Sequence, residues 1–431
     1  MAVNNALRTS AANGDEEKQT SVVSRETIEA RGTGTEDDVE RDVKEFIASR
    51  NGISVKGELR AFFTLLTFFT RLPGPAWTDH HPGYLMRGMV YAPLVGGVIG
   101  VYVSIFFDAA TAVGMPAMVA GAASTGAGFW LTGCFHEDGL ADTADAFGGG
   151  WTRTQIKRIM ADSRLGTYGC AVLAIYLLAK LALLDGLGAS SWALHRCSGA
   201  GPALLCTHVV SRVSAVILLR LHRYIADDGP KTSYYTWLSR ANVLVTQVRV
   251  GIVIAVAAAT AYALYGAVLS AMLLTVLLLV ALSAGSYGKA VLGGVMGDFL
   301  GATICATELA LLASITAAPA LLGVASDVQQ LVSDGKTGAD AVHAFALYVT
   351  SSSEGCALLR LAGIVLITWL WSKCVGAIRS WPIVDDEDYD EQEKEKIQEQ
   401  NDEEVAPPPT SADADASAAT KPQRRWRRRK E

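Results

Sequence analysis

The sequence lacks the motifs of several common enzyme classes. It contains neither GxxxxGK(S/T) nor GxSxG, which argues against a P-loop ATPase and against a serine hydrolase. Its seven cysteines form no CxxC pair and no zinc spacing, so we expect reduced packing residues. No secretory signal opens the chain, and the acids among the first forty residues argue against an Arg-rich transit peptide.

The chain is instead rich in apolar residues, and they are concentrated in its middle. Half of its 431 residues are hydrophobic, and the mean hydropathy is +0.27 even though both ends are polar. Residues 1–56 have no sustained apolar period and are predicted to form a disordered polar extension. Residues 57–382 form the predicted membrane domain, in which 324–358 is interpreted as a variable loop insert. Residues 383–431 are predicted to be a disordered charged tail.

The apolar runs are long enough to cross a membrane, which takes about 20 residues in a helix. We therefore predict an all-α, polytopic membrane helical bundle of about eight transmembrane helices. The predicted spans are 89–108, 114–134, 168–186, 201–219, 248–265, 267–285, 303–323 and 360–377. The block 248–285 is too long for one crossing, so we divide it at Tyr265-Gly266, although one tilted helix remains an alternative. The run 61–69 is too short to cross, which favours an interfacial or re-entrant helix.

Lysine and arginine in the short loops predict the orientation. They concentrate on the face reached after the second span, so we assign that face, both termini and the active site to the cytosolic or equivalent side. Four predicted crossings separate an acidic motif at 136–151 from a glycine-rich motif at 293–302. Because an even number of crossings returns the chain to the same face, the two motifs are expected to share one site.

The acidic motif, HEDGLADTADAFGGGW, contains four carboxylates in nine residues and no lysine or arginine. In a helix, Asp138, Asp142 and Asp145 lie at i, i+4 and i+7 on one face, and Glu137 lies beside that face. Like charges at this spacing repel, so helix stability does not explain them. Carboxylate oxygens from one face suit Mg²⁺, which also accepts substrate phosphate oxygens. We interpret this face as a magnesium site, with a solvated acidic loop as the simpler alternative.

Residues after the acidic motif are candidates for phosphate binding. Gly148 and Gly149 allow the backbone to approach a bulky phosphorylated ligand closely. Arg164 has the planar fork that contacts two phosphate oxygens, although a membrane-surface anchor is an alternative. Ser163 either faces the same phosphates or caps the next helix.

Three further residues are expected to point toward the same region. Asp298, between glycines in GGVMGDFLGA, is a fifth candidate carboxylate, as a metal ligand, a base or a helix cap. His208 and Arg212 lie one turn apart in a predicted span. A charged residue there is costly and usually turns toward a polar cavity. Arg212 is therefore a candidate substrate-binding residue, whereas His208 alone is more typical of a packed residue.

Magnesium carboxylates with arginine clamps at a membrane face favour phosphoryl or phosphodiester transfer. At this point the chain resembles the cobalamin synthase family (adenosylcobinamide-GDP ribazoletransferase, cobalamin-5′-phosphate synthase). The resemblance extends over about 58–323 plus the last predicted helix. It rests on FFTRLPGP, APLVGGVIG, HEDGLADTADAFGGGW, IMADSRLGTYG, HVVSRVSAVILLR and GGVMGDFLGA, in that order.

The resemblance implies an enzyme that joins adenosylcobinamide-GDP to α-ribazole or its 5′-phosphate, releasing GMP and using Mg²⁺. It implies a metal and diphosphate centre at Glu137, Asp138, Asp142 and Asp145. It also implies that Ser163 and Arg164 face the phosphates. We count Asp142, Asp145 and Asp298 as catalytic, with Asp145 or Asp298 as the candidate base. Met296 stands where the family usually has threonine, which would remove a hydroxyl contact.

Two other functions remain alternatives. A CDP-alcohol phosphotransferase also carries an aspartate-rich helix, with a DG-x-x-A pattern that residues 138–141 resemble, but Asp142 stands in place of its arginine and the spacing of its later aspartates is missing. An ion-coupled transporter would carry its acids nearer the midplane and repeat the motif in two halves. The expected partners are the two small-molecule substrates and the lipid bilayer, without nucleic acid. A homo-oligomer and a complex with other late cobalamin enzymes are left open, as is the host membrane.

Overall fold

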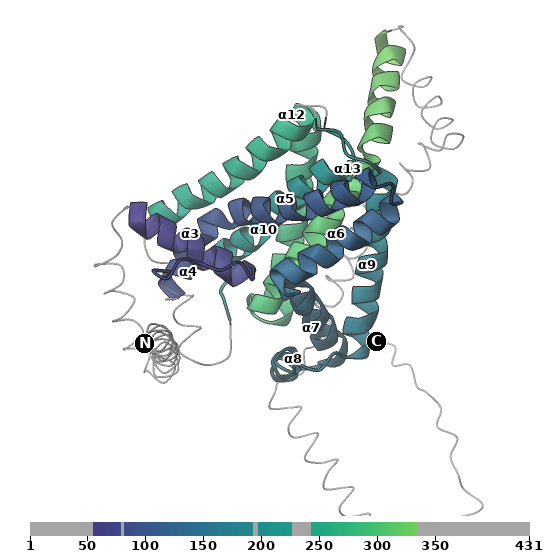
Figure 1. The fold of residues 1–431 in the computed structure, drawn as a ribbon. Coiled ribbons are helices and arrows are strands. Elements are labelled where there is room, and N and C mark those ends of the chain that lie inside the picture. Colours follow the sequence, from purple (N-terminus) through teal and green to yellow (C-terminus); the bar gives the residue numbers. More distant parts are fainter. Residues whose placement is uncertain (1–54, 79–81, 193–196, 226–242, 334–431) are drawn as a thin grey trace, which may run out of the picture. The chain divides into compact units, whose positions relative to one another are not determined.

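The computed structural model describes residues 55–78, 82–192, 197–225 and 243–333. These ranges are all-α and contain no strand, only isolated β-bridges at Ser191–Ser198 and Tyr224–Val295 (Figure 1). The predicted fold class is therefore confirmed. In chain order the helices are α3 (Val55–Phe69), α4 (Pro82–Gly88), η2 (Met89–Tyr91), α5 (Ala92–Ala112), α6 (Ala117–Thr132), α7 (Phe135–Gly149), α8 (Arg153–Met160), α9 (Thr167–Leu187), α10 (Ala200–Leu221), α12 (Val243–Val291) and α13 (Gly297–Ser333).

Within the described ranges, five helical segments are long and apolar enough to cross a membrane. They are Gly83–Ala112, Thr167–Leu187, Ala200–Leu221, Val248–Val291 and Gly297–Ala318. The chain is thus a membrane protein, but the predicted number of eight spans is not confirmed. Two predicted spans lie within the single segment Val248–Val291, and the predicted span 360–377 lies outside the described residues.

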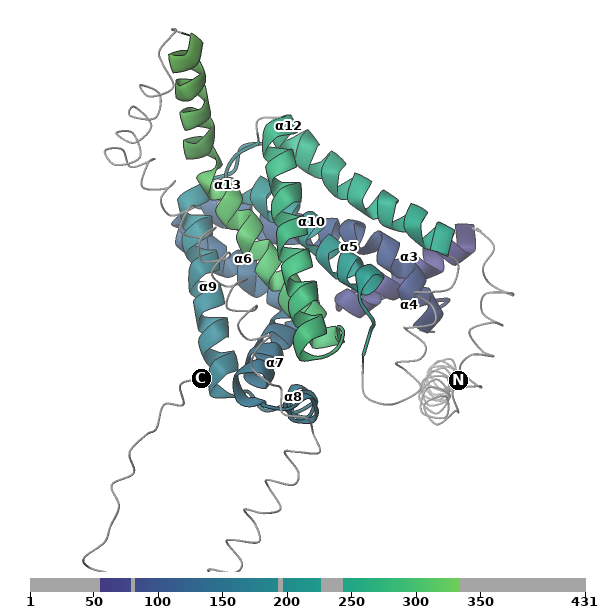
Figure 2. The same ribbon diagram turned by 180° about the vertical axis from the view of Figure 1, so that it is seen from behind.

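Helix α12 contains the predicted division. Gly266 has φ 76° and ψ −174°, which is non-helical, and the helix kinks there. Figure 2 shows the two arms of α12 meeting at a sharp angle. A positive φ costs glycine little because it has no Cβ, so this residue is suited to separate the two arms.

Helix α6 is shorter than the predicted span 114–134, with 16 residues between Pro116 and Gly133. Gly133 has φ 67° and Cys134 has φ 59°, both left-handed, and these two residues turn the chain directly into α7. The turn ends the apolar helix and begins the acidic one. Helix α3 has 15 residues, fewer than a crossing needs, as expected for the short apolar run at 61–69.

Helix α10 is the centre of the bundle. Ninety-four per cent of its apolar stretch is buried inside the protein, against 17% for α9. It packs against α5, α12 and α13. On α5, Gly96 and Gly100 face α10, and a Cβ at Gly100 would lie 2.8 Å from the Cα of Leu205. Small residues at this spacing let two membrane helices approach closely.

The predicted N-terminal extension up to residue 54 and the charged tail lie outside the described residues. Helix α13 continues to Ser333, so it extends beyond residue 323, where the sequence analysis placed the end of the span. The start of α13 lies beside α7, at the opposite end of the bundle from the kink of α12 (Figure 1).

Candidate functional site

The acidic motif forms α7, as the spacing predicted. Asp138 is exposed, Asp142 is half-buried and Asp145 is buried, and all three lie on one face of the helix. Phe135 and His136, in the first turn, pack against Phe69 of α3 at ring-centroid distances of 6.0 and 5.3 Å. The first turn of α7 is therefore held by aromatic packing, while the acidic face continues away from it.

The two motifs that are far apart in the sequence meet, as predicted. Asp298 lies in the first turn of α13, against Gly139 of α7. A Cβ at Gly139 would lie 2.7 Å from the carbonyl oxygen of Asp298 and 2.9 Å from its Cα, so only glycine permits this approach. Val295, just before α13, exchanges backbone hydrogen bonds with the segment after α10: its N–H donates to Arg223 O at 2.8 Å and its carbonyl accepts from Ile225 N at 2.7 Å.

This contact concentrates negative charge at one place. Burial, together with the carboxylates of Asp138, Asp298 and Asp145 in decreasing order, raises the pKa of Asp142 to about 6. Like charges that disfavour each other's ionised form are stabilised by a cation placed between them. Among the described residues, no group of three or more His, Cys, Asp or Glu side chains is arranged to hold a metal ion. Mg²⁺ is commonly bound by only one or two carboxylates plus waters and phosphates, so the donor chemistry still fits it.

Asp145 has a second role that the sequence pattern did not indicate. Its carboxylate accepts hydrogen bonds from the backbone N–H groups of Gly166, at 2.7 Å, and Gly169, at 2.9 Å. Those donors stand at the start of α9, where backbone N–H groups lack partners within the helix. Asp145 thus caps α9 from another helix and fixes the loop 161–166 to α7.

The predicted phosphate-binding residues lie on this loop and on the end of α7. Ser163 and Arg164 are exposed, and the Arg164 guanidinium pairs with Asp162 in its own loop. Gly148 packs against the ring of Tyr168, and Gly149 lies near Ile159 of α8. These residues lie at the same end of the bundle as α7, but the Arg164 guanidinium does not contact the carboxylates of α7. The phosphate-binding roles of Arg164, Ser163 and the two glycines stay predictions.

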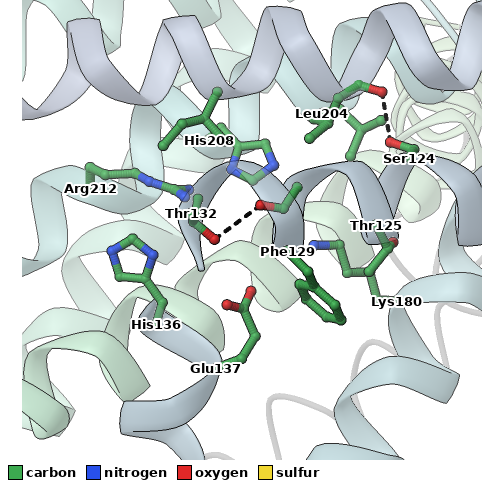
Figure 3. A pocket seen from close by; sticks show the side chains of 13 residues that line it. Ser124, Thr125, Phe129, Thr132, His136, Glu137, Lys180, Leu204, His208 and Arg212 are labelled. Carbon is green, nitrogen blue, oxygen red and sulfur yellow. Dashed lines mark hydrogen bonds between the residues drawn. The ribbon is translucent and has the colours of Figure 1, made fainter. Parts of the chain in front are cut away.

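Arg212 and His208 turn toward a polar cavity, as expected for charged groups within a span. Figure 3 shows them around a cavity of about 10 Å³ together with His136, Glu137 and Lys180. Arg212 Nη1 lies 3.4 Å from Oε2 of Glu308 on α13, and it is 2% exposed. This burial leaves the predicted contact of Arg212 with substrate untested and gives the residue an intramolecular partner.

Glu137 points into the same cavity rather than along the acidic face. Burial raises the pKa of Glu137 although the charges of Lys180 and Arg212 lower it, and burial with the nearby Arg212 charge lowers the pKa of His136 to about 3. Lys180 and Glu308 were not among the site residues predicted from the sequence. Each is a single charged residue inside an apolar run, which is the signal that could have identified them.

An apolar pocket of about 80 Å³ lies next to the acidic site, between α3, α4, η2, α7, α10 and α13. Its lining includes Gly297, one residue before Asp298, and Phe135 and His136 in the first turn of α7. The other lining side chains are apolar apart from Tyr224, and they are Phe68, Phe69, Leu85, Met86, Met89, Ala215, Leu219, Leu300 and Ile304 with Gly301. Gly297 and His136 in its lining directly precede Asp298 and Glu137, so a hydrophobic group bound in this pocket would lie close to the acidic site.

The fold and this site define a polytopic, all-α membrane protein whose carboxylates gather where two helices begin. The chain belongs to the cobalamin-5-phosphate synthase family, whose model matches residues 61–316, from α3 into α13. The matched range contains both motifs and the buried cluster around Glu308.

Individual relatives carry the name adenosylcobinamide-GDP ribazoletransferase. Those of Shewanella frigidimarina and Shewanella oneidensis are 43% identical to the chain over 176 residues, which is 41% of this chain and 65% of each relative. A relative from Shewanella sp. (strain ANA-3) is 42% identical with the same coverage. The chain therefore spans 65% of the length of these relatives, slightly less than two thirds. No solved structure is significantly similar to the chain.

Proposed function

We propose that the protein is a Mg²⁺-dependent membrane transferase that joins adenosylcobinamide-GDP to α-ribazole or α-ribazole 5′-phosphate. The products are adenosylcobalamin, or its 5′-phosphate, and GMP. One observation carries the proposal: in a member of this family, Asp298 of α13 lies against the carboxylate-bearing face of α7. The names of the relatives supply the substrates.

In the reaction, a hydroxyl of the ribazole attacks the phosphate attached to cobinamide, and the bond from that phosphorus to GMP breaks. Asp138 and Asp142 would hold Mg²⁺ near the diphosphate. The ion would neutralise charge on the diphosphate and on the departing GMP. We assign phosphate oxygens to Ser163 and Arg164, which lie exposed on the loop 161–166 that Asp145 fixes to α7.

We assign the proton acceptor to Asp298 rather than Asp145. Both carboxylate oxygens of Asp145 already accept backbone N–H groups of the α9 start, whereas the Asp298 carboxylate is hydrogen-bonded within its own residue and directly follows Gly297, which lines the apolar pocket. A base must lie within hydrogen-bond reach of the hydroxyl that it deprotonates. A ribazole whose aromatic base entered the pocket would bring its ribose beside Asp298.

The pocket favours the ribazole as its occupant because its apolar walls include aromatic and methionine side chains. Its volume of about 80 Å³ is smaller than the ~150 Å³ cavity that accepts a benzene ring, so it accommodates one edge of a fused ring. Met86 and Met89 can adjust to the rest, since methionine side chains are flexible.

The orientation follows the positive-inside rule, which favours a cytosolic or equivalent location for the active site and both termini. Such a location gives the site access to soluble nucleotide products and substrates.

The test uses the full chain in lipid nanodiscs, supplied with adenosylcobinamide-GDP, α-ribazole and Mg²⁺. Release of GMP that requires both organic substrates, with a matching cobalamin product, supports the proposal. GMP release without ribazole would identify a hydrolase instead, and CMP release from a CDP-alcohol would identify a lipid phosphotransferase. α-Ribazole and its 5′-phosphate, compared by kcat/KM, show which nucleophile the site prefers.

A further inference from the structure

The buried cluster of charges around Glu308 is incomplete as a set of ion pairs. Lys180 Nζ lies 2.7 Å from Glu308 Oε1, and Arg212 Nη1 lies 3.4 Å from Glu308 Oε2, with all three side chains at most 5% exposed. They come from α9, α10 and α13, within segments apolar enough to span a membrane. One carboxylate therefore faces two cations, which leaves an excess positive charge in a place where an unpaired charge is costly.

Glu137 is placed to supply the missing negative charge. It lines the cavity of about 10 Å³ together with Lys180 and Arg212 (Figure 3). Its Oε2 atom is buried without a hydrogen-bond partner, and so are Arg212 Nε and His136 Nε2. The two histidines that face the cluster, His136 and His208, are 2% and 4% exposed, and burial lowers the pKa of His136.

The cavity has room for one water molecule and enough polar atoms to bind it. A buried water needs about 10–15 Å³ and two to four polar partners. The unpartnered atoms of Glu137, Arg212 and the histidines provide these partners. Such a water would join α7 to the ion pairs of α9, α10 and α13.

We propose that Glu137 is the second anion of a buried charge quartet with Lys180, Arg212 and Glu308, completed by one water, and not a metal ligand. The inference deepens the proposed function and rests on it, because it removes one residue from the predicted ligand set. Glu137 then acts as a positioning residue. Successive residues of a helix point about 100° apart, so fixing Glu137 in the cavity sets the direction in which Asp138 and Asp142 face Asp298.

The decisive experiment is a double-mutant cycle between Glu137→Gln and Lys180→Met, with the full chain in nanodiscs. Each single variant leaves an unbalanced charge and is expected to lower the unfolding midpoint, whereas the double variant restores neutrality and recovers at least about half of the loss. Glu137→Gln combined with Lys289→Met is the matched control, because Lys289 is an exposed lysine at the end of α12. This control is expected to show no recovery.

A second readout separates a positioning residue from a metal ligand. In the double variant, the Mg²⁺ concentration for half-maximal GMP release is expected to stay within about twofold of wild type. Loss of a true ligand, as in Asp138→Asn, is expected to raise it well beyond that range, because metal affinity depends on the number of charged ligands. A double variant no more stable than either single variant, or one with the Mg²⁺ requirement of Asp138→Asn, overturns the quartet.

Two features keep this test informative. If Lys180→Met alone does not fold, the quartet predicts that the double variant with Glu137→Gln folds again. A double variant that also fails to fold contradicts the quartet. The unfolding measurement needs no substrate, so it decides the quartet even if wild type releases no GMP, an outcome that would refute only the proposed function.

Discussion

Replacing Asp142 by asparagine is expected to stabilise the metal-free protein while abolishing turnover. The Asp142 carboxylate is half-buried and lies near three other acidic side chains. Burial and these negative charges raise its pKa to about 6. An amide of the same shape removes the repelling charge and keeps the packing. The same change removes an oxygen that we assign to Mg²⁺, so stability and activity should move in opposite directions.

The pKa shift sets the size of the stability gain. A rise from the ordinary 3.8 to about 6 means that the folded protein binds more protons than the unfolded chain in that pH window. Stability therefore falls as pH rises through the window, and the full cost is present above it. About two pKa units correspond to about 3 kcal/mol. Solvent screening at this half-buried side chain reduces the gain to about 1 kcal/mol, or about 2 °C in the unfolding midpoint.

The assay compares thermal unfolding of wild type and Asp142→Asn at pH 7.5, with EDTA and with excess Mg²⁺, alongside GMP release. The variant should unfold at a higher temperature in EDTA, should gain less from Mg²⁺ than wild type, and should release no GMP. Normal turnover would exclude Asp142 from catalysis. A lower unfolding temperature in EDTA would show that the acidic cluster does not repel as described.

Three further changes test neighbouring features. Asp145→Ala should lower the free energy of unfolding by about 3 kcal/mol, because two buried amides at the start of α9 lose a charged acceptor; denaturation with and without Mg²⁺ measures it. Gly139→Ala should abolish GMP release by pushing α7 away from Asp298, whereas Gly126→Ala, with open space around its Cβ position, should leave it unchanged. Met86→Phe, which fills part of the apolar pocket, should raise the KM for α-ribazole severalfold without changing the KM for adenosylcobinamide-GDP. An equal rise in both KM values would contradict the assignment of ribazole to this pocket.

The sequence was sufficient to predict the meeting of the two motifs, and that prediction depended on dividing the block 248–285 into two crossings. The structure places the motifs together and kinks the block at Gly266, within one segment long and apolar enough to cross a membrane. The helical face of Asp138, Asp142 and Asp145 followed from spacing alone, and the kink followed from a glycine in a block too long for one crossing. These features depend on periodicity and length, which a sequence contains directly.

The partners of buried charges could not be predicted in the same way. Helices α9 and α13 are apolar around most of their circumference, so periodicity does not tell which face of each meets the other. The pairing of Lys180 with Glu308 therefore required the structure. Likewise, a carboxylate within a row of acids has the same local pattern whether it binds a cation or caps a helix. The role of Asp145 depends on where the loop after α8 returns.

The close approach of Gly139 to Asp298 also constrains how the protein is made. The acid-bearing helix emerges from the ribosome well before α13, because residues 150–296 lie between them. Until α13 has inserted, those carboxylates lack the neighbour that completes their surroundings, and a nascent chain arrested before residue 298 would lack the proposed catalytic centre. The proposed activity is therefore expected only once nearly the whole family-matched region has been synthesised and packed.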